Sequence, residues 1–323
     1  FSWDDQGNWL TLPGKPGPVS LSYGDGEGGH RLLSDGEMNY QYDARGAVIA
    51  RVDPGNGQTL NLDRDPIGRL IGATLLDDMS SVISQASFAY TTSGARTFAE
   101  VDGVRRHFVY DGDNVILVLD DSGQVVSRRL QDRAVDRPLA VDDGNEIQWL
   151  LTDHLGSVRN VVSTNGQSLA EFAYTPFGEQ ILGPAPSLDD SIRFTGREFD
   201  IPGGLGYYRA RVYAPDIARF LSEDPIEPWH YRYAENNPLR YTDPSGKTAA
   251  ISYALQACNS VAKVLKILGG AGGRGAGEFF ETVMLAAADG LKGEEVDPEE
   301  VLKAIEKLFA PRLLLPCGAK ITL

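Results

Sequence analysis

Two aspartates that each stand directly before a proline are the residues best suited to chemistry in this chain. Asp224 and Asp243 lie in segment 206–246, GYYRARVYAPDIARFLSEDPIEPWHYRYAENNPLRYTDPSG, where aromatic, strand-like pieces alternate with Asp-Pro and Asn-Pro turns. Two carboxyl groups held close together cannot both ionise, so they share one proton. One then acts as an acid on a carbonyl and the other as a base on water. In the alternative interpretation both aspartates only start turns, as Asp before Pro often does.

The elements that must position these side chains are predicted to be repeated β-hairpins. Each copy has an aromatic-x-aromatic strand, a polar turn with Gly and an apolar strand. Alternation at period two places the aromatic residues on one face, and Gly accepts a positive φ in the turn. A single hairpin cannot bury its apolar face, so we expect the hairpins to join into a continuous antiparallel sheet. The alternative is an ordinary β-sandwich or propeller. Copies begin at Phe1, Tyr40, Leu62, Phe88, Phe108 and Phe172.

These hairpins resemble the YD repeats of RHS-repeat proteins, and the resemblance covers residues 1–200 or so. Thr152–Arg159 (TDHLGSVR) and Phe194–Glu198 (FTGRE) are similar to two signatures near the core of that family, and segment 206–246 resembles the core motif itself. The resemblance implies a mainly β fold, in which a curved antiparallel sheet of hairpins forms part of a hollow shell. It also implies a C-terminal segment that varies between family members.

The composition changes sharply after Gly246, where helix-forming residues replace the aromatic ones. Asp297 and Pro298 are a typical N-cap and first residue of a helix, and Gly269 is a typical stop. We therefore predict three domains: a YD-repeat sheet over 1–150, an RHS-associated core over 151–246 and a small α-helical segment over 247–323.

The resemblance implies that the core cuts its own chain, as an aspartyl-type autoprotease. The residues that match the catalytic pair of the family are Asp224 and Asp243, and Arg211 matches its supporting arginine. A guanidinium beside two carboxyl groups can hold one of them ionised and orient it. Neither a cofactor nor a metal site is predicted, and His154 is interpreted as a turn or core histidine that bonds to backbone.

The expected cleavage region is Gly246, Lys247 and Thr248. The family usually has a leucine after its DPxG motif, and its cleavage follows that leucine, whereas this chain has Lys247. A lysine in an apolar pocket must extend toward solvent or be buried unfavourably. The substitution therefore predicts a slow cut or none, and the sequence leaves open which of these holds.

The charge of the chain bears on its partners. The 323 residues carry a net charge of -15, all of it in 1–246, because 247–323 holds nine basic and nine acidic residues. Phosphate repels such a surface, which disfavours nucleic acid as a partner of the core. No apolar run is long enough to predict a transmembrane span. Both cysteines, Cys258 and Cys317, stand outside any CxxC pattern.

The function predicted from this resemblance is that of a shell fragment that encapsulates or presents its own C-terminal segment, as in polymorphic toxins of bacteria. Such a protein is expected to be secreted or at the cell surface, with secretion machinery or an immunity protein as further partners. The chain starts with Phe1, as a fragment would, and 323 residues are too few to close a whole shell of this family, so we also expect further repeats upstream. Two alternatives stay open: a non-catalytic extracellular YD-repeat adhesion or scaffold protein, and a glycoside-cleaving enzyme with paired carboxylates.

Overall fold

The computed structural model describes residues 2–4, 7–12, 21–24, 29–132, 134–226, 231–247 and 249–251. The chain divides into two compact units, Phe1–Ala250 and Ile251–Leu323. The second unit, apart from its first residue, lies outside the described residues. The predicted helices after residue 251 and the two cysteines therefore lie there as well.

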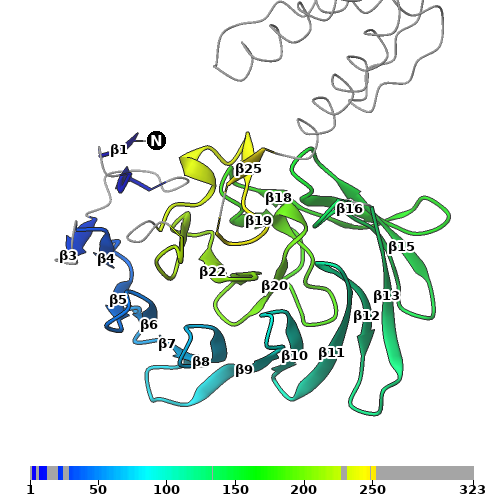
Figure 1. Ribbon diagram of the computed structural model, residues 1–323, viewed down its shortest axis with the longest axis horizontal. Helices are drawn as coiled ribbons and strands as arrows, with labels where there is room; N and C mark the ends of the chain where they lie inside the picture. Colours follow the sequence, from blue (N-terminus) through cyan, green and yellow to red (C-terminus); the bar gives the residue numbers. More distant parts are fainter. Residues whose placement is uncertain are drawn as a thin grey trace, which may run out of the picture. The chain divides into compact units, whose positions relative to one another are not determined.

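Most of the first unit is one antiparallel sheet of 15 strands. Every strand pairs with the next one along the chain, from β3 to β17, so the sheet is a continuous meander. Figure 1 shows this sheet curling around the segment that carries β18 to β23, which we call the inner segment. The prediction of a mainly β fold with a curved antiparallel sheet is thus confirmed. Its strands are β3 (Ser22–Gly24), β4 (Arg31–Ser34), β5 (Asn39–Tyr42), β6 (Val48–Val52), β7 (Thr59–Arg64), β8 (Leu70–Leu76), β9 (Val82–Tyr90), β10 (Arg96–Val101), β11 (Val104–Asp111), β12 (Asn114–Leu119), β13 (Val125–Gln131), β14 (Pro138–Asp142), β15 (Ile147–Thr152), β16 (Val158–Val162) and β17 (Ser168–Glu171).

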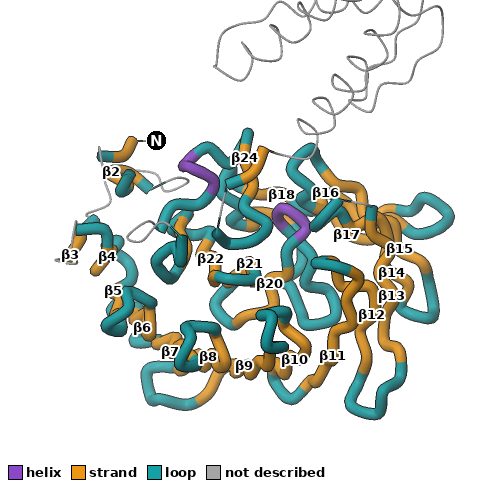
Figure 2. Tube along the Cα trace, in the orientation of Figure 1, coloured by secondary structure: helices purple, strands orange, loops and turns teal. Residues whose placement is uncertain are grey.

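The remaining elements of the described residues are short (Figure 2). One sheet has four strands and three sheets have two strands each. Two single turns of 3-10 helix accompany them. The four-stranded sheet consists of β20 (Glu198–Ile201), β21 (Leu205–Tyr208), β22 (Arg211–Ala214) and β23 (Arg219–Phe220). The others are β1 (Ser2–Trp3) with β2 (Trp9–Thr11), β18 (Ala173–Tyr174) with β19 (Gln180–Leu182), β24 (Tyr241–Thr242) with β25 (Ala250–Ile251), η1 (Phe194–Gly196) and η2 (Ala234–Asn236).

Many hairpins turn at an Asp and a Gly that stand three residues apart. In the turn of Asp43, the Gly46 amide donates to the Asp43 carbonyl at 3.1 Å, and the Asp43 carboxylate accepts from the Ala47 amide at 2.9 Å. The turn that starts at Asp65 and ends at Gly68 repeats both kinds of contact. Each of these two glycines has a positive φ. The side chain of Asp and the freedom of Gly therefore set each turn locally.

The aromatic residues of the repeat also tie neighbouring strands together. The hydroxyl of Tyr42 donates to the Leu32 carbonyl at 2.8 Å, and that of Tyr90 donates to the Leu70 carbonyl at 2.6 Å. A buried phenol needs such a partner, because an unpaired hydroxyl in an apolar setting costs free energy. Apolar side chains of the sheet and of β20 to β23 form one core, which explains why all four residues of β20, β21 and β22 are buried.

Buried ion pairs join the sheet to this inner segment. The Arg96 guanidinium in β10 meets the Asp200 carboxylate in β20 at 2.6 Å, and both side chains are almost fully buried. Two more pairs have the same arrangement, with arginine on the sheet and the acid on the inner segment: Arg129 with Glu198 and Arg51 with Asp216. In a low-dielectric interior such pairs fix which groups face one another, since an unpaired charge there is costly.

Gly46→Ala is expected to destabilise the protein more than Gly68→Ala. Both substitutions place an alanine at positive φ, which costs about 1–2 kcal/mol. A Cβ at Gly46 would in addition overlap the Glu223 carboxylate and lie 2.8 Å from the Tyr231 hydroxyl, whereas one at Gly68 meets nothing within 4 Å. Overpacking adds roughly 1–3 kcal/mol. Urea unfolding of both variants measures the difference, and equal losses would contradict this view of the Gly46 turn.

Candidate active site

The two aspartates predicted to be catalytic each come shortly after a short strand. Asp224 stands four residues after Phe220, the end of β23, and Asp243 comes directly after β24. Each uses one carboxylate oxygen to start a turn: Oδ1 of Asp224 accepts from the Ile226 amide at 2.8 Å, and Oδ1 of Asp243 accepts from the Lys247 amide at 3.1 Å. One oxygen of each carboxylate therefore forms a turn, as the alternative interpretation predicted. The second oxygen of each carboxylate makes other contacts.

Those second oxygens meet at one arginine. Nη2 of Arg211 lies 2.8 Å from Oδ2 of Asp224 and 3.0 Å from Oδ2 of Asp243. The two carboxylate oxygens are therefore no farther apart than the sum of these distances. Arg211, Asp224 and Asp243 are 3%, 8% and 2% exposed. The structure thus brings together all three residues predicted from the sequence. We call them the Asp–Arg–Asp cluster.

An aromatic ring supports the guanidinium of Arg211. The Cζ atom of Arg211 lies 3.7 Å from the ring centre of Phe220, which is a short cation–π contact. Burial lowers the pKa of the Arg211 guanidinium, while Asp224 and Asp243 oppose this effect. The ordinary pKa of arginine is so high that the group stays charged at neutral pH. One positive charge therefore faces two carboxyl groups in this buried cluster.

The sequence interpretation did not assign the residues beneath the cluster. Tyr208, Tyr213, Phe220 and Tyr233 form a buried aromatic group, and the ring centres of Tyr213 and Tyr233 are 4.5 Å apart. Burial raises the pKa of the Tyr233 hydroxyl. The available signal was the high density of aromatic residues in segment 207–233, which contains all four of these rings.

The chain just after Asp243 is held tightly at Gly246. Its φ of +67° is one that favours glycine, and a Cβ there would overlap the Tyr208 carbonyl oxygen and lie 3.0 Å from the Arg211 amide nitrogen. Nε of Arg211 donates to the Gly246 carbonyl at 2.5 Å. The side chain of Lys247 is exposed. Of the two outcomes expected for a lysine here, extension toward solvent is therefore the one observed. Thr248 lies outside the described residues.

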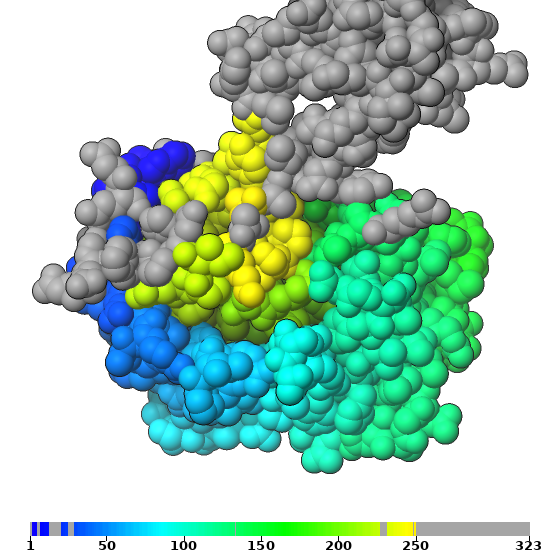
Figure 3. Space-filling view, in the orientation of Figure 1, coloured from blue at the N-terminus to red at the C-terminus, as the bar shows by residue number. Residues whose placement is uncertain are grey.

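In the space-filling view the yellow part of the chain, which includes η2 and β24, reaches the surface between the N-terminal strands in blue and later strands in green (Figure 3).

In the part of the chain that the structure describes, no group of His, Cys, Asp and Glu could hold a metal ion. The predicted backbone bond of His154 is confirmed, since Nε2 lies 3.1 Å from the Leu239 carbonyl oxygen. Among the described residues, no helix has the length and apolar character needed to cross a membrane.

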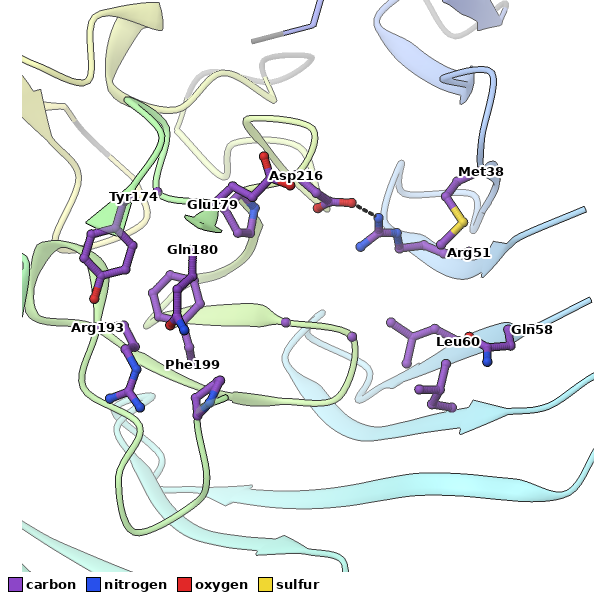
Figure 4. A pocket seen from close by; sticks show the side chains of 16 residues that line it. Met38, Arg51, Gln58, Leu60, Tyr174, Glu179, Gln180, Arg193, Phe199 and Asp216 are labelled. Atoms are coloured by element: carbon purple, nitrogen blue, oxygen red, sulfur yellow. Dashed lines mark hydrogen bonds and ion pairs between the residues drawn. The ribbon is translucent and has the colours of Figure 1, made fainter. Parts of the chain in front are cut away.

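A cavity of about 370 Å³ lies between the sheet and the inner segment, apart from the cluster. Figure 4 shows Arg51 and Asp216 pointing toward one another, with Met38 beside Arg51, and Leu60 and Gln58 on the sheet. Neither Asp224 nor Asp243 lines this cavity. The interior of the curved sheet thus contains space that its own side chains leave unfilled. The other lining residues are Leu75, Tyr174, Gly178, Glu179, Gln180, Pro186, Arg193, Phe199, Gly203, Gly204 and Pro215.

A curved meander of Asp-turn hairpins around a buried inner segment defines a YD-repeat shell protein, as the sequence resemblance predicted. The family model described as Teneurin YD-shell matches residues 1–255. The chain belongs to this family.

Several known proteins are similar to parts of this chain. Salivary gland surface protein 1 of Aedes aegypti is 31% identical over 58% of this chain and 6% of its own length. Double-stranded DNA deaminase toxin A of Burkholderia cenocepacia is 27% identical over 79% of this chain and 19% of its own length. Toxin protein Tse5 of Pseudomonas aeruginosa is 27% identical over 68% of this chain and 19% of its own length. The chain thus spans less than a fifth of each of these relatives.

Among solved structures, the crystal structure of TcdB2-TccC3 is similar to this chain. It is 20% identical, with a TM-score of 0.45, over 65% of this chain and 13% of that chain.

Proposed function

We propose that this chain is part of an RHS shell that holds its own C-terminal segment and cuts the link to that segment with the Asp–Arg–Asp cluster. The observation that carries the proposal is the pairing of Arg211 with both Asp224 and Asp243 inside the protein. A structural role alone needs only one carboxylate for one guanidinium, since a second buried negative charge adds a desolvation cost. Buried, like-charged carboxyl groups are the arrangement by which acid–base pairs divide their roles.

Two lines of support concern the container. The curved sheet surrounds the inner segment and leaves a cavity beside it. Double-stranded DNA deaminase toxin A and toxin protein Tse5, by their printed names, are toxins. We therefore propose polymorphic-toxin delivery as the biological role, with the segment 247–323 as cargo and secretion outside the cell as its route. Secretion machinery and an immunity protein are the further partners proposed.

In the proposed reaction the two carboxyl groups start with one proton between them. Asp224 accepts a proton from water, which attacks a backbone carbonyl beside the cluster, and Asp243 delivers a proton to the leaving nitrogen. Arg211 stabilises the negative charge that develops on the carbonyl oxygen. A glycoside-cleaving role is not favoured, since both carboxylates are buried and bound to Arg211.

The cut is expected to separate two pieces that stay together while the protein is folded. Native size-exclusion chromatography of the 323-residue chain should give one peak. Denaturing electrophoresis of the same peak should give a large band and a band of about a quarter of the chain, as the position of Gly246 requires. A single full-length band after denaturation would contradict the proposed cut.

A second candidate is a non-catalytic extracellular adhesion or scaffold protein. The similarity to Salivary gland surface protein 1, which by its printed name is a surface protein, supports it. In that case the Asp–Arg–Asp cluster only closes the inner segment. The same electrophoresis distinguishes the two candidates, because a scaffold protein stays in one piece.

A further inference from the structure

The backbone that follows Asp243 is held by the turn between β21 and β22. Three consecutive residues of this turn donate to three consecutive carbonyl oxygens: Nη1 of Arg209 to Pro244, the Ala210 amide to Ser245 at 3.2 Å and Nε of Arg211 to Gly246 at 2.5 Å. Arg209 has a φ of +52°, a left-handed conformation that a residue with a side chain keeps only where its contacts hold it. These contacts therefore fix the path of the chain beside the Asp–Arg–Asp cluster.

The large sheet reaches this turn through the carboxylate of Asp136. This residue stands between β13 and β14 and is 8% exposed. Its Oδ1 accepts from Nη2 of Arg209 at 2.7 Å, and its Oδ2 accepts from Nη1 at 2.8 Å. Nη2 of Arg209 also donates to the carbonyl of Asp113, in the turn between β11 and β12, at 2.8 Å. One guanidinium thus joins two hairpin turns of the sheet to the Pro244 carbonyl.

Asp136 is itself held by its neighbours. Its amide donates to Oδ1 of Asn114 at 3.0 Å, and its Oδ1 also accepts from Nη1 of Arg197 at 2.6 Å. A Cβ on Gly196 would overlap the Asp136 carbonyl oxygen, and one on Gly156 would lie 3.0 Å from it. Gly156 belongs to the TDHLGSVR signature and Gly196 to FTGRE. Both signatures therefore pack against Asp136, a residue that neither of them contains.

The charge of Asp136 matters most to Arg209. Among the described residues, Arg209 forms an ion pair with Asp136 alone, at 2.7 Å, whereas Arg197 also pairs with Glu198 at 3.3 Å. A guanidinium presents several donors in one plane, so Arg209 can bind both oxygens of the carboxylate and a backbone carbonyl together. Loss of the Asp136 charge therefore leaves Arg209 without its acid, while Arg197 keeps one.

We infer that Asp136 is a positioning residue for the proposed cut and acts through Arg209. This inference rests on the proposed function. A reacting peptide group must be held in one orientation, and a displacement of about 1 Å can cost roughly 100-fold in rate. Asp136 and Asp113 belong to hairpin turns of the sheet, and they hold the residue that binds Pro244. The cut is thereby coupled to the closure of the sheet on the inner segment, and the link to the C-terminal segment stays whole until that wall has formed.

Asp136→Asn tests the inference, because it keeps the size of the side chain and removes its charge. The cut should slow by about 10- to 100-fold, measured as the fraction of small fragment in denaturing electrophoresis at fixed times after synthesis. The matched control is Asp216→Asn, which removes the acid of another ion pair between the sheet and the inner segment and should keep the original rate. Equal slowing in both variants would reveal a general effect of packing and overturn the inference.

A second substitution tests the route through Arg209. Arg209→Lys keeps the positive charge, but one ammonium group cannot bind both oxygens of Asp136 and the Pro244 carbonyl together, so the cut should slow to a similar extent. The double variant with Asp136→Asn should then be no slower than the slower single variant, because the two residues act as one unit. Losses that multiply would show that Asp136 acts by another route, against the inference.

Hydrogen exchange provides a readout that does not depend on cleavage. In the uncut background of Asp224→Asn, the further change Asp136→Asn should speed exchange of the Gly246 and Lys247 amides by at least about 10-fold and leave the amides of β8 unchanged. Unchanged exchange at Gly246 and Lys247 would overturn the inference. If the unmodified chain stayed whole, the proposed function would fall and the inference with it. If the chain cut equally fast with and without Asp136→Asn, the inference alone would fall.

Discussion

Asp243→Asn is expected to abolish the self-cleavage of this chain, with a rate at least about 100-fold below that of the unmodified protein. The asparagine still accepts the turn hydrogen bond from Lys247 but can no longer deliver a proton to the leaving nitrogen. Asp224→Asn should have an effect of similar size, since it removes the base. The measurement is the fraction of small fragment in denaturing electrophoresis at fixed times after synthesis.

The folded state should tolerate this change, which makes the prediction specific. The unmodified cluster holds two carboxyl groups against one guanidinium, whereas Asp243→Asn leaves Arg211 and Asp224 as a neutral pair at 2.8 Å. Far-ultraviolet circular dichroism and the melting temperature of the variant should stay close to those of an uncut protein. A variant that cuts at the original rate would show that Asp243 has only a structural role.

A matched control comes from another Asp-Pro turn. Asp53 precedes Pro54, and its Oδ1 accepts from the Gly55 amide at 2.7 Å, much as Asp224 accepts from Ile226. This turn joins β6 to β7, and its residues 54–57 are exposed. Asp53→Asn should therefore leave the cut unchanged. If Asp53→Asn also lost cleavage, the loss would reflect a general effect of Asp-Pro turns on folding. The variants Asp224→Asn and Asp243→Asn would then no longer test catalysis.

Features encoded by neighbouring residues could be predicted from the sequence. The hairpins follow from an Asp and a Gly a few residues apart and from aromatic residues at period two, and both signals are local. The cluster was also within reach, because Asp224 and Asp243 occupy motif positions that resemble a known family. The domain boundaries at residues 150 and 246 stay a prediction. In the structure the sheet runs across residue 150 within β15 and continues to β17.

Contacts that depend on how the sheet curves could not be predicted. Arg96 and Asp200 stand 104 residues apart, and nothing in the local pattern indicates that they meet. The same holds for the contact between Nε of Arg211 and the Gly246 carbonyl, which follows from the packing of β22 against the turn after β24. The sequence left open whether the Lys247 side chain extends toward solvent or is buried. Its observed exposure depends on the direction of the backbone, which the positive φ of Gly246 sets.

Asp200→Asn is expected to destabilise the protein by about 3–5 kcal/mol, the largest stability effect we predict. Its carboxylate binds Arg96 through both oxygens, at 2.8 and 2.6 Å, and the side chains are 0% and 2% exposed. Burial lowers the pKa of Arg96, yet Asp200 outweighs this and raises the pKa above its ordinary value. Removing the carboxylate charge leaves that buried guanidinium without the acid that binds it directly. Glu198 still acts on it electrostatically, and Phe88, Phe108 and Tyr207 still surround it.

The free energy of unfolding in urea measures this loss, and two further variants show its origin. Asp142→Asn, which removes the acid of an exposed pair with Arg128 on the same sheet, should cost less than about 1 kcal/mol. The double variant Arg96→Met with Asp200→Leu should regain much of the loss, because it removes both charges and keeps apolar volume between the sheet and the inner segment. If Asp200→Asn cost no more than Asp142→Asn, the buried pair would not be what holds the inner segment to the sheet. The aromatic core around Tyr208 would then have to do so alone.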